Sequence, residues 1–358
     1  MNKKEKELFL QLCNFEDVDT DKLKELLVQN ATPSVLGHLF FNRMQGIAYG
    51  VLKESNMLNL INREFRNSLH TAYEYNVLKN RDYNRLVDMV YEILLPCGEK
   101  YAMLKGAYLC QEYPLGYRTS NDIDILVRAD EVSEIGALLS AKGFKQGKIV
   151  NGAFVAASRR EIIESKMMRG ETVPYILETD SPYIKYLEVD INFSLDYKNG
   201  DRKVVDKMLG NAVKFCSGKA RIVTLEKYDF FLHLCGHLYK EASTYPWIKM
   251  RRDMTLYKYC DIYRMIRRFS QQDIEALLKR AKEIGMTEIC ACVVLWTSQL
   301  FYIGNTRMVN TFKKVLEGKE EILDIVFSPS EGRKYIFVDK NIKNRFFSED
   351  RCAILKEV

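Results

Sequence analysis

Two aspartates lie one residue apart inside an otherwise apolar run, RTSNDIDILV at residues 118–127. In a β-strand alternate side chains point to the same face, so Asp122 and Asp124 would share one face and Ile123 would lie on the other. Adjacent carboxylates repel each other, and such a pair is normally tolerated only where solvent, a cation or a basic side chain neutralises it. The run therefore predicts a strand with concentrated negative charge on one face.

A second run, YLEVDINF, alternates in the same way. Glu188, Asp190 and Asn192 fall on one face of the expected strand, and the apolar residues fall on the other. Carboxylates from two neighbouring strands supply the oxygen ligands that Mg²⁺ requires, and two Mg²⁺ ions can activate an attacking hydroxyl and stabilise a leaving pyrophosphate. A lone Asp-x-Asp pair is more often a solvated strand edge, so the metal hypothesis depends on all three carboxylates occurring together.

A short apolar run ends in LKGAYL at residues 104–109, where a strand is expected to give way to a helix. Gly106 would let a phosphate approach the backbone, and the N-terminus of the following helix would offer free N–H groups. A strand-to-helix turn often needs a glycine for structural reasons alone. The turn supports a phosphate site only together with the carboxylates downstream.

Hydrophobic periodicity divides the chain into helical residues 1–98, a sheet-forming part at 99–223 and helical residues 224–358. The predicted fold class is α+β, a small mixed β-sheet core flanked by N-terminal and C-terminal helical regions. Asp19 or Thr20 is a candidate cap for the helix DKLKELL, and Ser270 for SQQDIEALLKRAKEIG. MRRDMTLYKYCDIYRMIRRF predicts another helix, and the tail past residue 315 is charged and less regular. The expected strands include DIDILV, GAFVAAS, EIIESKM, VPYILET and YIKYLEVDINFSL.

The amino-acid composition argues against several classes of protein, including zinc-binding, disulfide-bonded and membrane-spanning proteins. The 358 residues carry a formal net charge of +6, which suits an anionic substrate such as a nucleotide or RNA and equally suits an ordinary solvated surface. Nine scattered cysteines without a CxxC pair, beside only four histidines, argue against a zinc site and against disulfide partners. The start of the chain is charged and amphipathic, and no apolar run reaches membrane-spanning length. We expect a cytoplasmic protein that does not enter a membrane.

The segments LKGAYL and YPLGYRTSNDIDILV resemble the nucleotidyltransferases of the DNA polymerase β-like superfamily. The resemblance is closest to a bacterial branch that includes uncharacterised nucleotidyltransferases and abortive-infection toxins, and it covers about residues 100–195. It implies an enzyme that moves a nucleoside monophosphate from a nucleoside triphosphate, ATP among the candidates, to a hydroxyl with release of pyrophosphate. The implied cofactor is Mg²⁺, with two ions. The acceptor is a small molecule, a protein or an RNA, and the residues do not identify it.

The same resemblance implies roles for individual residues. Asp122 and Asp124 would be catalytic metal ligands, and Asp190 would be the third carboxylate, which also helps to deprotonate the acceptor hydroxyl. A second set of residues would bind the nucleotide. In this set Gly106 would contact the triphosphate, Lys105 and Arg118 would bind its phosphate groups, and Ser120 would stabilise the loop before the strand. This set is Lys105, Gly106, Ala107, Arg118 and Ser120.

Two positions depart from the superfamily pattern. Ala107 stands where relatives often have a residue that supplies a hydroxyl to the triphosphate, and Asn192 stands where many have histidine. Further along the chain, His233 and His237 are more consistent with a core or pocket-lining role than with metal binding. Lys240 and Asp261 are weaker candidates for lining the nucleotide or acceptor pocket.

Two other functions fit the same residues. One is a non-catalytic nucleotide-binding or antitoxin-like protein on the same fold, which would bind a nucleotide without releasing pyrophosphate. The other is an RNA-binding protein that uses the basic helical half of the chain. Its affinity would fall steeply with salt and would survive loss of the aspartates.

Overall fold

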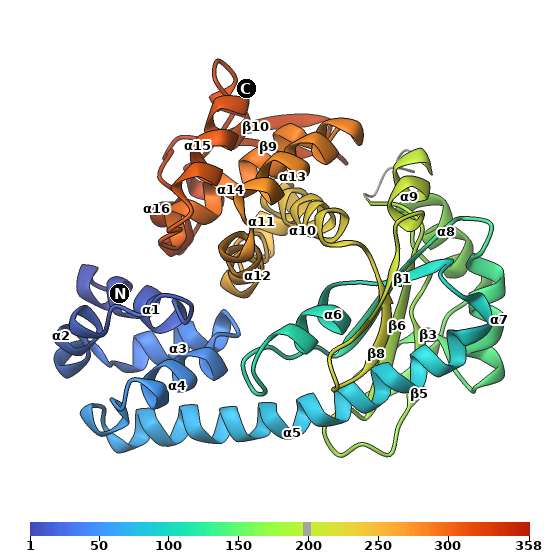
Figure 1. Ribbon diagram of the computed structural model, residues 1–358, viewed down its shortest axis with the longest axis horizontal. Helices are drawn as coiled ribbons and strands as arrows, with labels where there is room; N and C mark the ends of the chain where they lie inside the picture. The colour runs from blue at the N-terminus through green and yellow to red at the C-terminus, as the bar shows by residue number, and fades with distance from the viewer. Residues whose placement is uncertain (196–201) are drawn as a thin grey trace. The chain divides into compact units, whose positions relative to one another are not determined.

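The computed structural model describes residues 1–195 and 202–358, without the side chains of residues 168 and 169. These residues form two compact units, which are considered separately below (Figure 1). The sheet unit is Glu74–Phe230, and the helical unit combines Met1–Tyr73 with Phe231–Val358. Helix α5, Arg63–Leu94, contributes residues to both units.

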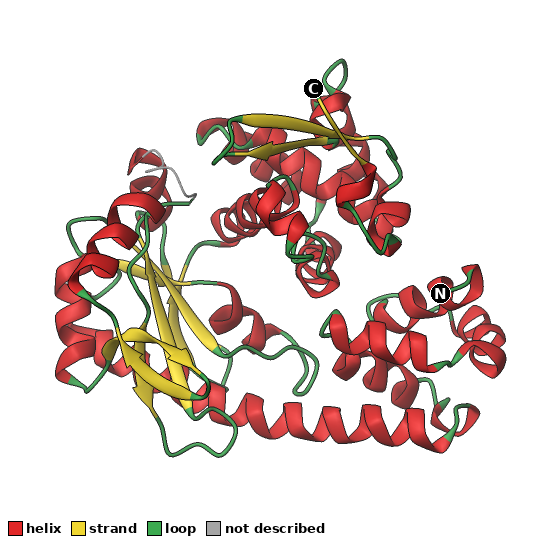
Figure 2. Cartoon of the chain, turned by 180° about the vertical axis from the view of Figure 1, so that it is seen from behind, coloured by secondary structure: helices red, strands yellow, loops and turns green. Residues whose placement is uncertain are grey.

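The sheet unit is built on six strands in the order β1-β2-β6-β5-β3-β4 (Figure 2). Strands β2 and β6 are parallel, whereas the other neighbouring pairs are antiparallel, so the sheet is mixed. The mixed sheet with its flanking helices confirms the predicted α+β class. The strands are β1 Tyr101–Met103, β2 Asp122–Val127, β3 Lys145–Val150, β4 Ala153–Ala156, β5 Tyr175–Glu178 and β6 Tyr186–Asn192.

Helices and one extra hairpin complete the sheet unit. They are α6 Lys105–Glu112, α7 Val132–Ala141, α8 Arg159–Arg169, α9 Arg202–Leu209, and the pair β7 Val213–Cys216 and β8 Arg221–Thr224. The apolar side chains of β2 and β6 lie in one buried cluster with residues of α5 and α7. Along β6 burial alternates residue by residue, so its carboxylates are directed to the face opposite this core.

The helical unit has a small sheet of its own, in the order β11-β10-β9. Its strands are β9 Ile325–Ser328, β10 Arg333–Phe337 and β11 Leu355–Glu357, in the tail that was expected to be irregular. Its helices are α1 Lys3–Cys13, α2 Thr20–Asn30, α3 Pro33–Phe41, α4 Gln45–Glu54, α10 Lys227–Ala242 (from residue 231), α11 Tyr245–Lys249, α12 Leu256–Arg268, α13 Gln271–Glu283, α14 Thr287–Leu300, α15 Thr306–Val315 and α16 Ile342–Phe347.

Two predicted caps are confirmed. The Asp19 side chain accepts the N–H of Lys22 at 3.0 Å, and Ser270 forms a reciprocal capping box with Asp273. The strand predicted for EIIESKM is wrong, because Ser158 and Glu161 cap each other's backbone and start helix α8 there. The helix predicted from MRRDMTLYKYC begins only at Leu256.

Among the residues that the structure describes, no helix is both long enough and apolar enough to cross a bilayer.

Candidate active site

The register of two parallel strands brings the predicted carboxylates together. Asp124 of β2 pairs with Asp190 of β6, and Asp122 pairs with Glu188. Residues paired in register on parallel strands direct their side chains to the same face, so these four acids are neighbours on the sheet. The face opposite the apolar core therefore holds a compact group of carboxylates.

Burial and mutual repulsion raise the pKa values of Asp124, Glu188 and Asp190. Burial raises the pKa of Asp190 well above its ordinary range, and the charges of Asp124 and Asp122 raise it further. Burial also raises the pKa of Asp124, against the opposing effect of Lys105. The pKa of Glu188 is raised by burial and then by Asp122. A cation bound at this face would reduce the repulsion between the carboxylates, which is one cause of the raised pKa values.

Lys105 supplies one cation directly. It is the first residue of α6, its backbone has a φ of +40°, and its Nζ lies 2.8 Å from Asp124 Oδ1. The preceding residue, Leu104, donates its N–H to the Asp124 carbonyl at 2.9 Å, which fixes the turn against β2. Burial alone would lower the pKa of Lys105, but the nearby carboxylates outweigh that effect and raise it. Lys105 is therefore a charged partner of the carboxylate group.

The need for glycine at position 106 has a structural cause. A Cβ on Gly106 would lie 2.5 Å from Ser120 Cβ and would also overlap Ser120 Oγ. The Ser120 hydroxyl donates to Asp122 Oδ1 at 2.8 Å, so the close packing places it on one of the predicted metal ligands. Gly106 and Ser120 thus form a tight contact between the turn and the strand.

Ala107 faces the core. Its side chain is fully buried in the apolar cluster, and its N–H donates to the Leu104 carbonyl at 3.1 Å. A serine at this position would place its hydroxyl in that cluster. The departure from the superfamily pattern at residue 107 therefore leaves the carboxylate face of the sheet unchanged.

Helix α5 holds the loop before β2 through a line of buried polar side chains that sequence reasoning missed. Asn76 donates to the Gly116 carbonyl at 3.1 Å, and Asn80 accepts the Gly116 N–H at 2.8 Å. Asn80 also donates to the Arg118 carbonyl at 2.8 Å, and Tyr83 donates to the Asp122 carbonyl at 2.7 Å. The spacing of these residues on one helical face was a usable signal.

Two predicted residues have partners that the sequence did not suggest. The Arg118 guanidinium donates to the Thr119 carbonyl within its own loop. Asn192 donates to the Asp190 carbonyl at 3.3 Å, and its side chain is among the groups that lower the pKa of Asp124 against the effect of burial.

A further acid near the site was not predicted. Glu171 forms an isolated antiparallel bridge with Asn192, and its charge is among the causes that raise the pKa of Asp190, after burial and the two aspartates of β2. The four weaker candidates belong to a different unit. His233, His237, Lys240 and Asp261 lie in the helical unit, and His237 Nε2 lies 3.4 Å from Glu241 Oε1 there.

The donor set suits Mg²⁺ by chemistry and by register, since oxygen ligands from adjacent strands face the same side. Within residues 1–195 and 202–358, no three His, Cys, Asp or Glu side chains are grouped closely enough to hold a metal ion. Oxygens of Asp124 and Asp122 are engaged instead by Lys105 and Ser120. A metal bound to Asp124 Oδ1 would therefore compete with Lys105 Nζ for that oxygen.

Comparison with known proteins supports the nucleotidyltransferase prediction. A family profile described as uncharacterised nucleotidyltransferase matches residues 34–302, which include every predicted site residue. No curated protein matches the chain. The abortive-infection branch and a bacterial origin stay predictions. Because the profile covers most of its length, the chain belongs to the uncharacterised nucleotidyltransferase family.

Proposed function

We propose that the protein is a Mg²⁺-dependent enzyme that transfers a nucleoside monophosphate from a nucleoside triphosphate to a hydroxyl. The pairing of Asp124 with Asp190 on adjacent parallel strands, with Asp122 on the same face, is the observation that supports this most strongly. Membership of the nucleotidyltransferase family agrees with it. In the reaction a bond forms between the acceptor oxygen and the α-phosphorus, and the bond from the α-phosphorus to pyrophosphate breaks.

Asp122, Asp124 and Asp190 are the residues that would hold the metal. When bound, Mg²⁺ would neutralise phosphate charge and favour the alkoxide form of the acceptor. Asp190 would accept the hydroxyl proton, because burial and the neighbouring aspartates raise its pKa towards the range where a carboxylate is an effective base. Ser120 would orient the Asp122 carboxylate, and Lys105, once released from Asp124, would bind the phosphates.

The binding half of this proposal can be tested without knowing the acceptor. The purified protein is heated with ATP, GTP, CTP or UTP, each with and without Mg²⁺, beside the Asp122→Asn/Asp124→Asn double variant. We expect one triphosphate to raise the melting temperature only with Mg²⁺, and the variant to lose that rise. Asp130→Asn is the matched control, since Asp130 is exposed and lies outside the carboxylate group. An undiminished rise in the double variant would contradict the proposal.

The chemical half is tested by pyrophosphate release with the stabilising triphosphate and separate pools of RNA, protein and small hydroxyl compounds. Asp190→Asn should reduce release at least about 100-fold, because it removes the proton acceptor. Binding without release in any pool would favour the non-catalytic nucleotide-binding function instead.

A further inference from the structure

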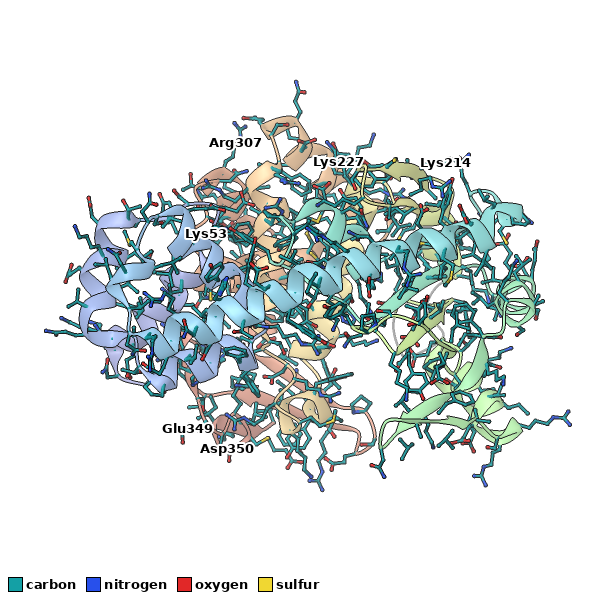
Figure 3. All side chains as sticks on the ribbon, turned by 90° about the horizontal axis from the view of Figure 1, so that it is seen from below. Lys53, Lys214, Lys227, Arg307, Glu349 and Asp350 are labelled. Atoms are coloured by element: carbon teal, nitrogen blue, oxygen red, sulfur yellow. The ribbon has the colours of Figure 1, made fainter. Side chains whose placement is uncertain are left out.

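A cavity of about 380 Å³ lies wholly within the helical unit. Its walls come from α1, α3, the turn before α12, and the end of α16 with the segment that follows. Figure 3 labels Glu349 and its neighbour Asp350, which belong to the segment that follows α16. The family profile ends at residue 302 and begins at residue 34, so part of this wall lies outside the matched region.

The wall carries more positive than negative charge. Lys6, Arg251 and Arg351 line the cavity, whereas Glu349 is the acid among its lining residues. Arg351 is already matched by the buried Asp253, with two contacts of 2.7 Å. Among the described residues, no acid lies within ion-pair distance of Lys6 or Arg251. An anion is the ligand that these two cations would accommodate.

Aromatic rings form the rest of the recognition surface. The Lys6 ammonium lies 5.3 Å from the centre of the Phe347 ring, and Phe41 also lines the cavity while its side chain stays 59% exposed. Burial lowers the pKa of His38 in the same wall, and the charges of Arg251 and Lys6 lower it further. The cavity thus combines a positive field with apolar ring faces.

The end of helix α11 fixes the backbone conformation of Arg251. Arg251 has a φ of +58°, a conformation that costs free energy for a residue with a side chain. Its N–H donates to the Ile248 carbonyl at 2.9 Å, which closes the turn after α11. Arg252 also donates its N–H to the Trp247 carbonyl at 2.9 Å, so Arg251 is the left-handed residue that ends α11, and its backbone is fixed by these hydrogen bonds.

We propose that this cavity binds a small phosphorylated compound with an aromatic ring. The phosphate would bind Arg251 and Lys6, and the ring would pack on Phe41 and Phe347. A guanidinium meets phosphate oxygens with two parallel hydrogen bonds, and a cavity of this size lies at the lower end of the range for small-molecule sites. The ligand is therefore a small molecule, and the site is separate from the carboxylate group in the sheet unit.

Titration calorimetry of the full chain with phenyl phosphate tests the proposal, in buffer with EDTA so that no divalent cation reaches the carboxylates. Inorganic phosphate and benzyl alcohol are titrated separately, to measure the contributions of the phosphate and of the aromatic ring. We expect phenyl phosphate to bind with a Kd between about 10 μM and 1 mM, more tightly than either half. Absence of binding by phenyl phosphate would overturn the proposal.

Variants locate the binding. Arg251→Asn should weaken phenyl phosphate at least about tenfold, and asparagine tolerates the left-handed backbone there, so the turn is preserved. Lys6→Met is a second variant with the same expected direction, and Phe41→Ala should weaken phenyl phosphate more than inorganic phosphate. Arg252→Asn, an exposed neighbour outside the cavity, is the matched control and should bind normally.

Two outcomes would overturn the assignment to this cavity. One is binding that survives both Arg251→Asn and Lys6→Met. The other is binding lost in the Asp122→Asn/Asp124→Asn double variant, which would place the probe at the carboxylate group. Because the probe is neither a triphosphate nor dependent on Mg²⁺, this result and the test of nucleotidyl transfer can fail independently.

Discussion

Replacing Lys105 with methionine should make the metal-free site bind a divalent cation more tightly. Lys105 Nζ lies 2.8 Å from Asp124 Oδ1, and Mg²⁺ binds carboxylate oxygens at about 2.1 Å, so two cations on that oxygen would be at most about 5 Å apart. Even with the dielectric constant of water, monovalent and divalent cations at about 5 Å repel by about 1.7 kcal/mol. We expect an affinity gain of at least about tenfold.

The same substitution should destabilise the metal-free protein, because it leaves the buried Asp124 carboxylate without its partner. The expected loss is about 3 kcal/mol in the free energy of unfolding at neutral pH. Burial already raises the pKa of Asp124, and Lys105 opposes that rise. Without Lys105 the folded-state pKa rises further above the unfolded one, so the loss should be largest at high pH and shrink as the pH falls.

Calorimetric titration with Mn²⁺ measures the affinity, and urea unfolding in EDTA measures the stability. Lys100→Met is the matched control, because Lys100 pairs with Glu134 at 3.6 Å on the surface, where a salt bridge contributes little. A Lys105→Met variant with unchanged or weaker metal affinity would refute the idea that the ammonium and the metal compete for Asp124. Loss of turnover together with tighter metal binding would agree with a second role for Lys105 at the phosphates.

Two further predictions concern stability. Gly106→Ala should lower the free energy of unfolding by about 2 kcal/mol, because the new Cβ clashes with Ser120. The double variant Gly106→Ala/Ser120→Gly should recover most of that loss, as measured by urea unfolding. If Gly106→Ala alone is as stable as the wild type, the turn can relax to accommodate the Cβ. Asp190→Asn should stabilise the metal-free protein by about 1 kcal/mol near neutral pH. Burial and the aspartates of β2 raise the folded-state pKa of Asp190 above its ordinary value of 3.8, so its ionisation costs stability as the pH rises past that value. The gain should therefore grow as the pH rises above that ordinary value, and a gain that does not change with pH would contradict this account.

The sequence predicted elements well where one local pattern decided them. DIDILV alternates a polar and an apolar face and coincides with β2, and Ser270 caps α13 through its own neighbours. EIIESKM contains two adjacent isoleucines, which favour a strand, but its first residue Glu161 forms with Ser158 the capping box that begins helix α8. The tail strands β9 to β11 are short, and they form a sheet only with partners that a local pattern does not specify.

Sequence alternation could predict the face on which a carboxylate lies, but not the residues that it contacts. Alternation places Asp122 and Asp124 on one face, yet only the pairing of β2 with β6 sets Asp190 beside Asp124. The positive φ of Lys105 and the packing of Gly106 against Ser120 depend on where the turn meets β2. These are contacts between distant segments, which hydrophobic periodicity does not encode.

The division of the chain into units has a consequence for biosynthesis. The helical unit combines Met1–Tyr73 with Phe231–Val358, whereas the sheet unit is one uninterrupted stretch of chain between them. Phe9 stacks on Phe346, and Asn14 accepts from Tyr263 at a separation of 249 residues, so helix α1 packs on residues that are synthesised much later than it is. At roughly 5–20 residues per second, its apolar face waits on the order of tens of seconds for these partners. Until those residues are made, the apolar face of α1 lacks the partners that bury it in the folded helical unit.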